Sequence, residues 1–166
     1  MMEFVKIPEE RKAIAIGKNA AVKKQIESLT ETEITIGDDV KIEGDDPVKI
    51  LDAKNIITAI GRGFAPEKAM KLSDNDNILE IISLKGFTPK KRPTQKGRLI
   101  GTKGKTRKLI EEFTGCDISV YGDTVSIIGG WESSNVAKQA IEQILEGRSH
   151  QSVYKFLEKN HTNNSS

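Results

Sequence analysis

The sequence predicts an α+β fold built from two tandem copies of one small unit. A glycine-containing motif occurs twice, 84 residues apart, at residues 16–20 and at residues 100–104. The helical patterns at residues 53–63 and 137–147 also match, with alanine, lysine, two isoleucines and glycine at the same spacing. Apolar residues alternate in some segments and recur at helical spacing in others, so each copy combines strands and helices. Similarity along the whole unit indicates a duplicated fold.

The order expected within a unit is strand, helix, helix, strand, strand, helix. In the first copy Asp46-Pro47 is a strong helix start, because the carboxylate caps free N–H groups and proline suits the first helical position. The elements expected are a strand at residues 4–7, a helix at residues 9–15, a helix carrying Val22, Ile26 and Leu29, a hairpin of residues 34–36 and 40–42, and a helix from Pro47 to Gly61 or Gly63.

The second copy is expected to repeat this order. Gly115 can close its second helix, and Ser133 or Ser134 can cap its last helix. Trp131, near the start of that helix, is expected to pack inside the fold, with a stacking platform for a base as the alternative. The elements expected are a strand at residues 78–84, a short helix at residues 94–100, a helix carrying Leu109, Ile110 and Phe113, a hairpin of residues 118–120 and 125–127, and a helix carrying Val136, Ala140, Ile141, Ile144 and Leu145.

The polar stretch at residues 73–77 is the expected seam between the copies, after a short helical segment at residues 66–72. We therefore expect a first unit at residues 1–75, a second unit at residues 76–148 and a C-terminal segment at residues 149–166. Val153, Phe156 and Leu157 predict a short amphipathic helix in that segment. The polar residues 161–166 are expected to fray.

Composition argues against several classes of protein. No run approaches the ~18 apolar residues of a membrane span, and no signal peptide opens the chain, so no membrane association is expected. The single Cys116 cannot form an internal disulfide, which fits a reducing cytoplasm. No metal-ligand spacing or paired-carboxylate site is present, so neither a cofactor nor an enzyme is expected. Glu111 is interpreted as a helix-surface carboxylate, and His150 and His161 receive no role.

The net charge of +2 conceals a strong segregation of charge. Residues 1–80 contain 12 basic and 16 acidic residues, whereas residues 81–166 contain 14 and 8. Residues 85–108 contain ten lysines and arginines and no acidic residue. Such a block predicts binding to a polyanion. The alternative is an ordinary solvated basic surface.

The motif at residues 101–104, Gly-Thr-Lys-Gly, lies inside this basic block between two expected helices. Glycine lacks the Cβ that would hold a sugar–phosphate backbone away. The N-terminus of the following helix favours a phosphate, and the surrounding cations make binding salt-dependent. An adjacent groove with Ile100 and Ile118 as its apolar floor is expected to hold unstacked bases, and Tyr121 is a candidate stacking residue.

A nucleotide-binding P-loop is an alternative interpretation of Gly104-Lys105-Thr106. That motif requires a glycine five positions before Gly104, where Leu99 stands. It also requires a strand leading directly into the loop, and here a helix is expected. Both departures argue against binding of a nucleoside triphosphate.

In this context the second motif resembles that of the KH family of single-stranded nucleic-acid-binding modules. The context is Ile-Gly-x-x-Gly-Lys followed by Ile-Glu, within the order strand, helix, helix, strand, strand, helix. The resemblance implies two tandem type I KH domains plus a short C-terminal helix. In the first copy Ala20 replaces the second glycine and the surroundings are acidic, so we expect no RNA site there. That copy is expected to face a protein or to serve as a structural partner.

Residues 96–107, 119–129, 146–150 and 153–154 resemble the archaeal two-KH-domain ribosome-assembly proteins, which are related to the eukaryotic "partner of Nob". The resemblance implies binding of single-stranded RNA at the 3′ region of small-subunit rRNA. It also implies a PIN-domain endonuclease and translation initiation factor two as partners. The residues expected at the RNA site are Arg98, Ile100, Gly101, Thr102, Lys103, Gly104, Lys105, Arg107, Lys108 and Ile118.

Two functions from other classes compete with this one. The chain could be a protein-interaction adaptor whose basic block contacts acidic protein surfaces. It could also be an RNA-processing enzyme, although the sequence offers no candidate catalytic site.

Overall fold

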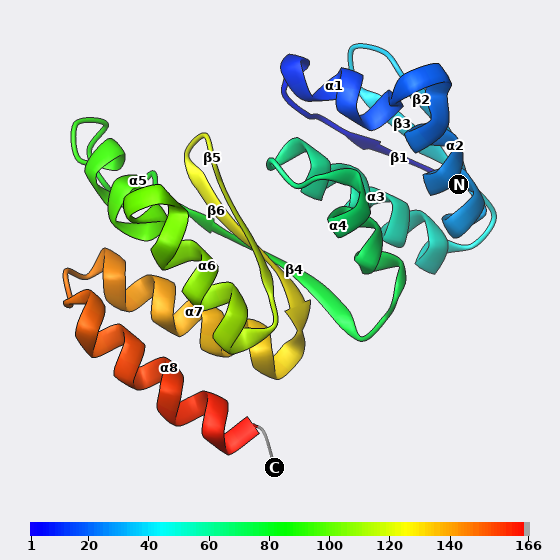
Figure 1. The fold of residues 1–166 in the computed structure, drawn as a ribbon. Coiled ribbons are helices and arrows are strands. Elements are labelled where there is room, and N and C mark those ends of the chain that lie inside the picture. The colour runs from blue at the N-terminus through cyan, green and yellow to red at the C-terminus, as the bar shows by residue number, and fades with distance from the viewer. Residues whose placement is uncertain (165–166) are drawn as a thin grey trace. The chain divides into compact units, whose positions relative to one another are not determined.

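The computed structural model describes residues 1–164 and contains two compact units (Figure 1). The first comprises residues 1–79, and the second begins at Glu80. Each unit combines helices with one three-stranded sheet, which confirms the predicted α+β class. The boundary falls inside strand β4 (Asn77–Ser83), just after the expected seam.

The first unit has the order strand, helix, helix, strand, strand, helix. Its sheet has the strand order β1-β3-β2, with antiparallel pairing throughout. Its elements are β1 (Met2–Val5), α1 (Glu9–Ile16), a 3-10 turn at Lys18–Ala20, α2 (Ala21–Thr30), β2 (Glu33–Ile36), β3 (Val40–Glu43), α3 (Pro47–Gly61), α4 (Pro66–Ala69) and a 3-10 turn at Met70–Ser73.

The second unit repeats this order and adds a helix. Its sheet has the strand order β4-β6-β5, and β5 pairs with β6 antiparallel. After β4 its elements are α5 (Arg92–Ile100), a 3-10 turn at Thr102–Gly104, α6 (Lys105–Thr114), β5 (Asp117–Tyr121), β6 (Thr124–Gly130), α7 (Trp131–Leu145) and α8 (His150–Asn164).

The core of each unit is aliphatic, as the abundance of isoleucine predicts. In the first unit Ile26 of α2, Ile42 of β3 and Ile57 of α3 are completely buried. In the second unit Ile127 of β6 and Ile144 of α7 are equally buried. Alternate residues of the strands reach these cores, so helices and strands stabilise each other by burying apolar surface.

An arginine on the first helix of each unit binds the C-terminal end of the long helix that follows the hairpin, α3 in the first unit and α7 in the second. Arg11 donates to the carbonyls of Ile60 (2.8 Å) and Phe64 (2.9 Å). Arg98 donates to the carbonyls of Ile144 and Arg148, the latter at 2.6 Å. The Ile60 and Ile144 carbonyls also accept from the N–H groups of Gly63 (3.1 Å) and Gly147 (3.0 Å), so each arginine adds a second hydrogen bond at a helix end. The acceptors of the first unit are 84 residues before those of the second, which is the spacing of the repeat. The two arginines are 87 residues apart, so they stand at positions that differ by about one helical turn between the units.

Three expected boundaries near the starts of the two units, both ends of β1 and the start of α5, are wrong by two residues. Strand β1 begins at Met2, which pairs with Glu43, and ends at Val5 instead of Ile7. Ile7 leaves the strand because it packs closely over Gly61, where an added Cβ would lie 2.6 Å from its Cγ2. Helix α5 begins at Arg92, with proline in its first turn, two residues before the expected start.

The predictions for the start of α7 are wrong. The helix begins at Trp131 after Gly130, so neither Ser133 nor Ser134 caps it, and Ser134 is buried. Trp131 is 74% exposed instead of packed. It precedes the first buried position of α7 by almost a full turn, and its ring therefore lies beyond the core.

The C-terminal helix is longer than predicted. Helix α8 runs from His150 to Asn164, so residues 161–164, which were expected to fray, are helical, and residues 165–166 lie outside the described part. Val153 and Leu157 are buried against the second core, as their spacing predicts. Within residues 1–164 no helix has the length and apolar character required to cross a bilayer.

Candidate nucleic-acid interface

Helices α5 and α6 are joined by residues 101–104, called here the 101–104 loop. Its left-handed backbone has φ values of 76° at Gly101, 55° at Lys103 and 73° at Gly104. At Gly101 an added Cβ would collide with the Oγ1 of Thr106 and lie 2.8 Å from its Cβ. At Gly104 the nearest heavy atom would be the Cε of Lys108, 3.9 Å away. The first glycine therefore permits packing of the loop, while the second leaves its outer surface bare.

The loop leads directly into the positive end of a helix. Gly104 is the N-cap of α6, and no side chain caps this end. The N–H of Lys105 donates to the Thr102 carbonyl of the preceding 3-10 turn, and the N–H groups that follow it lack acceptors within the ten-residue helix. Free N–H groups together with the helix dipole favour an anion at this position.

The basic residues predicted to surround the loop fall into two kinds. Lys103, Lys105 and Lys108 are exposed, and they can approach a polyanion from solvent. Arg107 is instead half-buried and paired with Glu111 at 2.8 Å. It contributes charge near the loop from a fixed position.

Glu111 is not the surface carboxylate that the sequence suggested. Besides pairing with Arg107, it accepts a hydrogen bond from the backbone N–H of Ile118 at 2.9 Å. The carboxylate therefore attaches the start of β5 to α6. Such bonds between a charged group and a backbone N–H are stronger than neutral ones.

Arg98 and Ile118 occupy structural positions, although both were predicted to contact RNA. The guanidinium of Arg98 is bound to the carbonyls at the end of α7. The side chain of Ile118 is 5% exposed and belongs to the core of the second unit. Ile118 offers almost no surface to a base because its position on β5 faces the helices. Ile100 is half-buried beside the loop and retains some exposed surface.

Two residues of α8 contact this region and were missed in the sequence. His150 donates from Nε2 to the carbonyl of Arg98 at 2.9 Å, since a carbonyl can only accept. The hydroxyl of Tyr154 lies 3.2 Å from that of Thr106. The two residues are four positions apart and so share one face of α8. The four-residue spacing of these two residues, beside the buried Val153, is the sequence signal that could have placed them at this site.

Comparison with known proteins identifies the family. The sequence profile of the eukaryotic-type KH domain (KH domain type I) matches residues 78–162. The chain is also 42% identical over 166 residues to the KH domain-containing protein MJ0443 of Methanocaldococcus jannaschii, covering 95% of this chain and 73% of that protein. The chain belongs to the KH domain family.

Two solved structures resemble this KH protein over nearly its whole length. Dim2p from Pyrococcus horikoshii OT3 is 45% identical, with a TM-score of 0.89 and coverage of 96% of this chain and 99% of that chain. A chain of the a/eIF2alpha–aDim2p–rRNA complex from the same organism is 44% identical, with a TM-score of 0.92 and coverage of 98% and 95%. The predicted relation to archaeal ribosome-assembly KH proteins is therefore confirmed.

The corresponding loop of the first unit has kept its backbone form despite losing a glycine. Gly17 has the same φ and ψ as Gly101, 76° and 173°, and Asn19 and Ala20 have left-handed φ values of 54° and 61°. Glu27 also accepts a hydrogen bond from the Ile34 N–H at 2.8 Å, as Glu111 does for Ile118. This KH protein therefore presents two loops with the same backbone shape. They differ in three of four residues, because Lys18, Asn19 and Ala20 stand where the second loop has threonine, lysine and glycine, and they differ in their surroundings.

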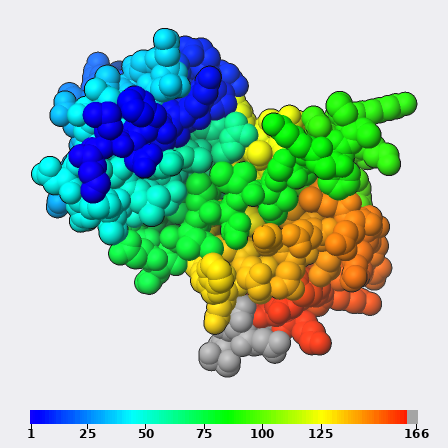
Figure 2. All heavy atoms as spheres, turned by 180° about the vertical axis from the view of Figure 1, so that it is seen from behind, coloured from blue at the N-terminus to red at the C-terminus, as the bar shows by residue number. Residues whose placement is uncertain are grey.

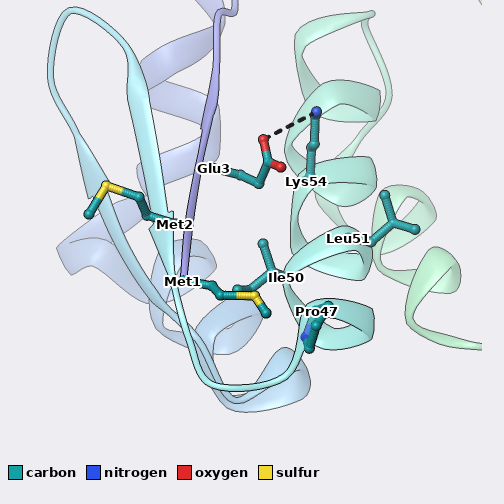
Figure 3. A pocket seen from close by; sticks show the side chains of 7 residues that line it. All are labelled: Met1, Met2, Glu3, Pro47, Ile50, Leu51 and Lys54. Carbon is teal, nitrogen blue, oxygen red and sulfur yellow. Dashed lines mark ion pairs between the residues drawn. The ribbon is translucent and has the colours of Figure 1, made fainter.

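The first unit carries an apolar groove between β1 and α3. In Figure 3 the side chains of Met1, Ile50 and Leu51 lie around it, and Glu3 and Lys54 form an ion pair across it at 3.6 Å. The groove has a volume of about 380 Å³. Figure 2 shows the N-terminal residues, dark blue, at the molecular surface.

A second, polar hollow adjoins this groove and shares Met1 with it. Its lining includes the four carboxylates of Glu31, Glu33, Glu43 and Asp45. Apolar and acidic surface thus meet on the first unit. The described residues of the whole chain contain no cluster of three potential metal ligands from His, Cys, Asp and Glu.

Proposed function

We propose that this KH protein is a single-stranded RNA-binding factor of small ribosomal subunit assembly. The observation that carries the proposal is the bare 101–104 loop at the uncapped start of α6, inside a segment without acidic residues. The similarity to aDim2p, which forms a complex with rRNA, supports the same ligand class. We assign the ligand to the 3′ region of small-subunit rRNA.

Each loop residue receives a role from its geometry. Gly101, Thr102 and Gly104 form the backbone surface against which the sugar–phosphate chain lies, as KH loops clamp the RNA backbone. Lys103 and Lys105 neutralise phosphates from solvent. These contacts position the strand without reading its bases.

Residues around the loop complete the site. Lys108 adds an exposed charge, and Arg107 adds one from its fixed position beside Glu111. Ile100 contributes the apolar edge next to the bases. Arg98 positions α5 through its bonds to the end of α7. Ile118 is left out of the contact surface because it is buried.

The substitution Gly104→Asp tests this assignment. An aspartate Cβ has open space at this position, and Asp tolerates left-handed backbone better than most residues, so the fold should persist. The carboxylate would repel a phosphate at the loop. We expect RNA affinity, measured by fluorescence anisotropy with single strands that include the rRNA 3′ end, to fall at least tenfold.

The matched control is Ala20→Asp, which places the same carboxylate at the equivalent left-handed position of the first unit. We expect this variant to bind RNA like the unmodified protein. Equal affinity of the unmodified protein and a folded Gly104→Asp variant would overturn the proposal, as would equal losses in both variants.

We also propose that the first unit is a second type I KH domain without an RNA site of its own. Its element order, strand order and loop conformation are those of the second unit. In this proposal the domains follow the units, and α8 is an extension of the second domain. The chain acts as a binder without catalytic activity. A cytoplasmic location and a PIN-domain endonuclease as partner stay predictions.

The groove of the first unit is the proposed docking site for a protein partner. Because a hollow with four carboxylates adjoins the apolar groove, a segment that fits both carries apolar side chains for the groove and basic side chains for the hollow. The relative found in complex with a/eIF2alpha makes the initiation-factor subunit the partner to test. We expect Leu51→Glu to weaken binding of that subunit in calorimetric titration.

Val48→Glu is the control for this docking site, because Val48 is exposed on α3 but does not line the groove. It should leave the affinity for the subunit unchanged, and neither variant should change RNA affinity. Unaltered binding of the subunit to the Leu51→Glu protein would exclude the groove as its docking site.

A further inference from the structure

A pocket of about 440 Å³ lies beside the 101–104 loop of the second unit, next to α8. The proposed function uses its loop side, Gly101, Thr102 and Lys105, but not the side formed by α8. It is lined from three elements: Arg98 of α5, Lys105 and Thr106 of α6, and His150 and Tyr154 of α8, together with Thr102 of the loop. Because the same loop residues face both the pocket and the proposed RNA strand, a ligand of the pocket would lie next to the RNA backbone.

The lining of this pocket is rich in hydrogen-bond donors. It contains the permanent cations Arg98 and Lys105, and none of the described residues that line it carries a carboxylate. The hydroxyls of Thr102, Thr106 and Tyr154 add donors that can turn toward a ligand. A surface that offers charged and neutral donors without competing carboxylates suits an anion.

The hydroxyl pair at the base of the pocket has an unused proton. Thr106 is 4% exposed, and its Oγ1 lies 3.2 Å from the hydroxyl oxygen of Tyr154. One hydrogen bond between two hydroxyls uses one of their two protons. Within residues 1–164 neither hydroxyl has a further hydrogen-bond partner, so one O–H remains available to a ligand.

The start of α6 supplies backbone donors to the same place. Lys105 and Thr106, which line the pocket, are its first two residues, and no side chain caps the helix at Gly104. The Lys105 N–H donates to the Thr102 carbonyl, so the N–H groups that follow it are the donors at this helix start. Backbone N–H groups at a helix start bind phosphate well because the helix dipole adds to their hydrogen bonds. The side chains and the helix therefore favour the same class of ligand.

We propose that this pocket is a second phosphate subsite, which binds a phosphate of the RNA strand adjacent to those on the 101–104 loop. The inference rests on the proposed function, since the strand is brought to the pocket by the loop. A KH loop clamps about four nucleotides of backbone. The subsite would extend the bound segment beyond these four, toward α8. The phosphate can be an internal diester or the terminal phosphate of a strand.

The test compares single strands of four and eight nucleotides on the full chain by fluorescence anisotropy. Eight-nucleotide strands are used with hydroxyl ends, with a 5′-phosphate and with a 3′-phosphate. The subsite predicts tighter binding of the eight-nucleotide strands. A further gain for one phosphorylated strand identifies a terminal phosphate, and no further gain identifies an internal diester.

Two variants locate the effect in the pocket. Tyr154→Phe keeps the ring and removes only its hydroxyl, and it should weaken binding of the eight-nucleotide strand by about tenfold, as expected for a hydrogen bond to a charged group. His150→Glu should remove the whole advantage of the longer strand. Both should bind the four-nucleotide strand like the unmodified protein.

Lys155→Glu is the matched control, since Lys155 is exposed on α8 next to Tyr154 but does not line the pocket. It should reduce affinity for the longer strand far less than His150→Glu. Equal losses in these two charge variants would overturn the subsite, and so would unchanged length dependence in the Tyr154→Phe protein. Failure of the unmodified protein to bind any strand would instead overturn the proposed function itself. Thermal melting checks that each variant is folded.

Discussion

The two glycines of the 101–104 loop have different physical tasks. Gly101 is needed because the loop packs against Thr106, whereas a Cβ at Gly104 would point into open space. The first unit supports this distinction. Gly17 is retained there, and its added Cβ would lie 2.5 Å from the Cγ2 of Val22. Ala20, in contrast, stands at the second position with the same left-handed backbone.

Alanine substitutions should therefore have unequal effects on stability. Gly104→Ala should cost about 1 kcal/mol, the usual penalty for a left-handed alanine. Gly101→Ala adds a steric collision and should cost about 2–5 kcal/mol in total. Hydrogen–deuterium exchange of α5 and α6 measures the local opening free energy. Equal protection of these helices in the two variants would contradict the division of tasks.

Single residues were predicted well where spacing alone decides their environment. The loop glycines, the buried Ile26 of α2 and Ile110 of α6, and the buried Val153 all follow from sequence spacing, whereas Leu29, expected on the same face as Ile26, is 41% exposed. Glu111 could not be predicted in the same way, because its acceptor role depends on a strand that folds back seven residues later. Trp131 was misjudged because its size suggested burial, whereas its exposure depends on where α7 begins.

In each unit an arginine connects two helices by hydrogen bonds, but the two arginines do not stand at equivalent positions of the repeat. Arg11 binds the end of α3 in the first unit and Arg98 binds the end of α7 in the second, and the two arginines lie about one turn apart on equivalent helices. Sequence comparison of the copies hides this shared feature, because the aligned positions carry different residues. It also explains why Arg98 was taken for an RNA contact: its charge was visible, but its acceptors are main-chain carbonyls.

Arg98→Ala should destabilise the second unit and leave the first unchanged. Loss of two hydrogen bonds from a charged donor, partly exposed, should cost about 2–3 kcal/mol. Exchange of the amides in α5 and α7 should quicken, while α1 and α3 keep their protection. Arg11→Ala should show the reverse pattern, with losses in the first unit. A variant of Arg98 with unaltered exchange but weaker RNA binding would favour a direct RNA contact instead.

The start and the length of α8 could not be predicted fully from the local sequence. Its apolar spacing was visible over one turn, and the helix continues to Asn164. Its N-terminal turn is held by bonds to distant residues, His150 to Arg98 and Tyr154 to Thr106. Such long-range contacts leave no periodic signal in the local sequence, so the role of α8 beside the loop required the fold.

At the scale of the whole molecule, two loops of one shape lie in opposite fields. Residues 1–80 carry an excess of acidic residues, and residues 81–166 carry an excess of basic ones. The 17–20 loop has the backbone of the 101–104 loop, so backbone shape alone does not distinguish them. Electrostatics does, because a long-range field of negative sign opposes the approach of RNA.

Lys24 and Lys108 allow this difference to be measured, since they are equivalent positions 84 residues apart and both are exposed. Lys108→Ala should weaken RNA binding, because it removes one phosphate contact. The slope of log affinity against log salt should become shallower by about 0.7, the value for one contact to a single strand. Lys24→Ala should change neither affinity nor slope, because the acidic surroundings keep the strand away from the first loop. Equal changes in both variants would mean that the strand also reaches the first unit, and that the loss of one glycine did not end RNA binding there.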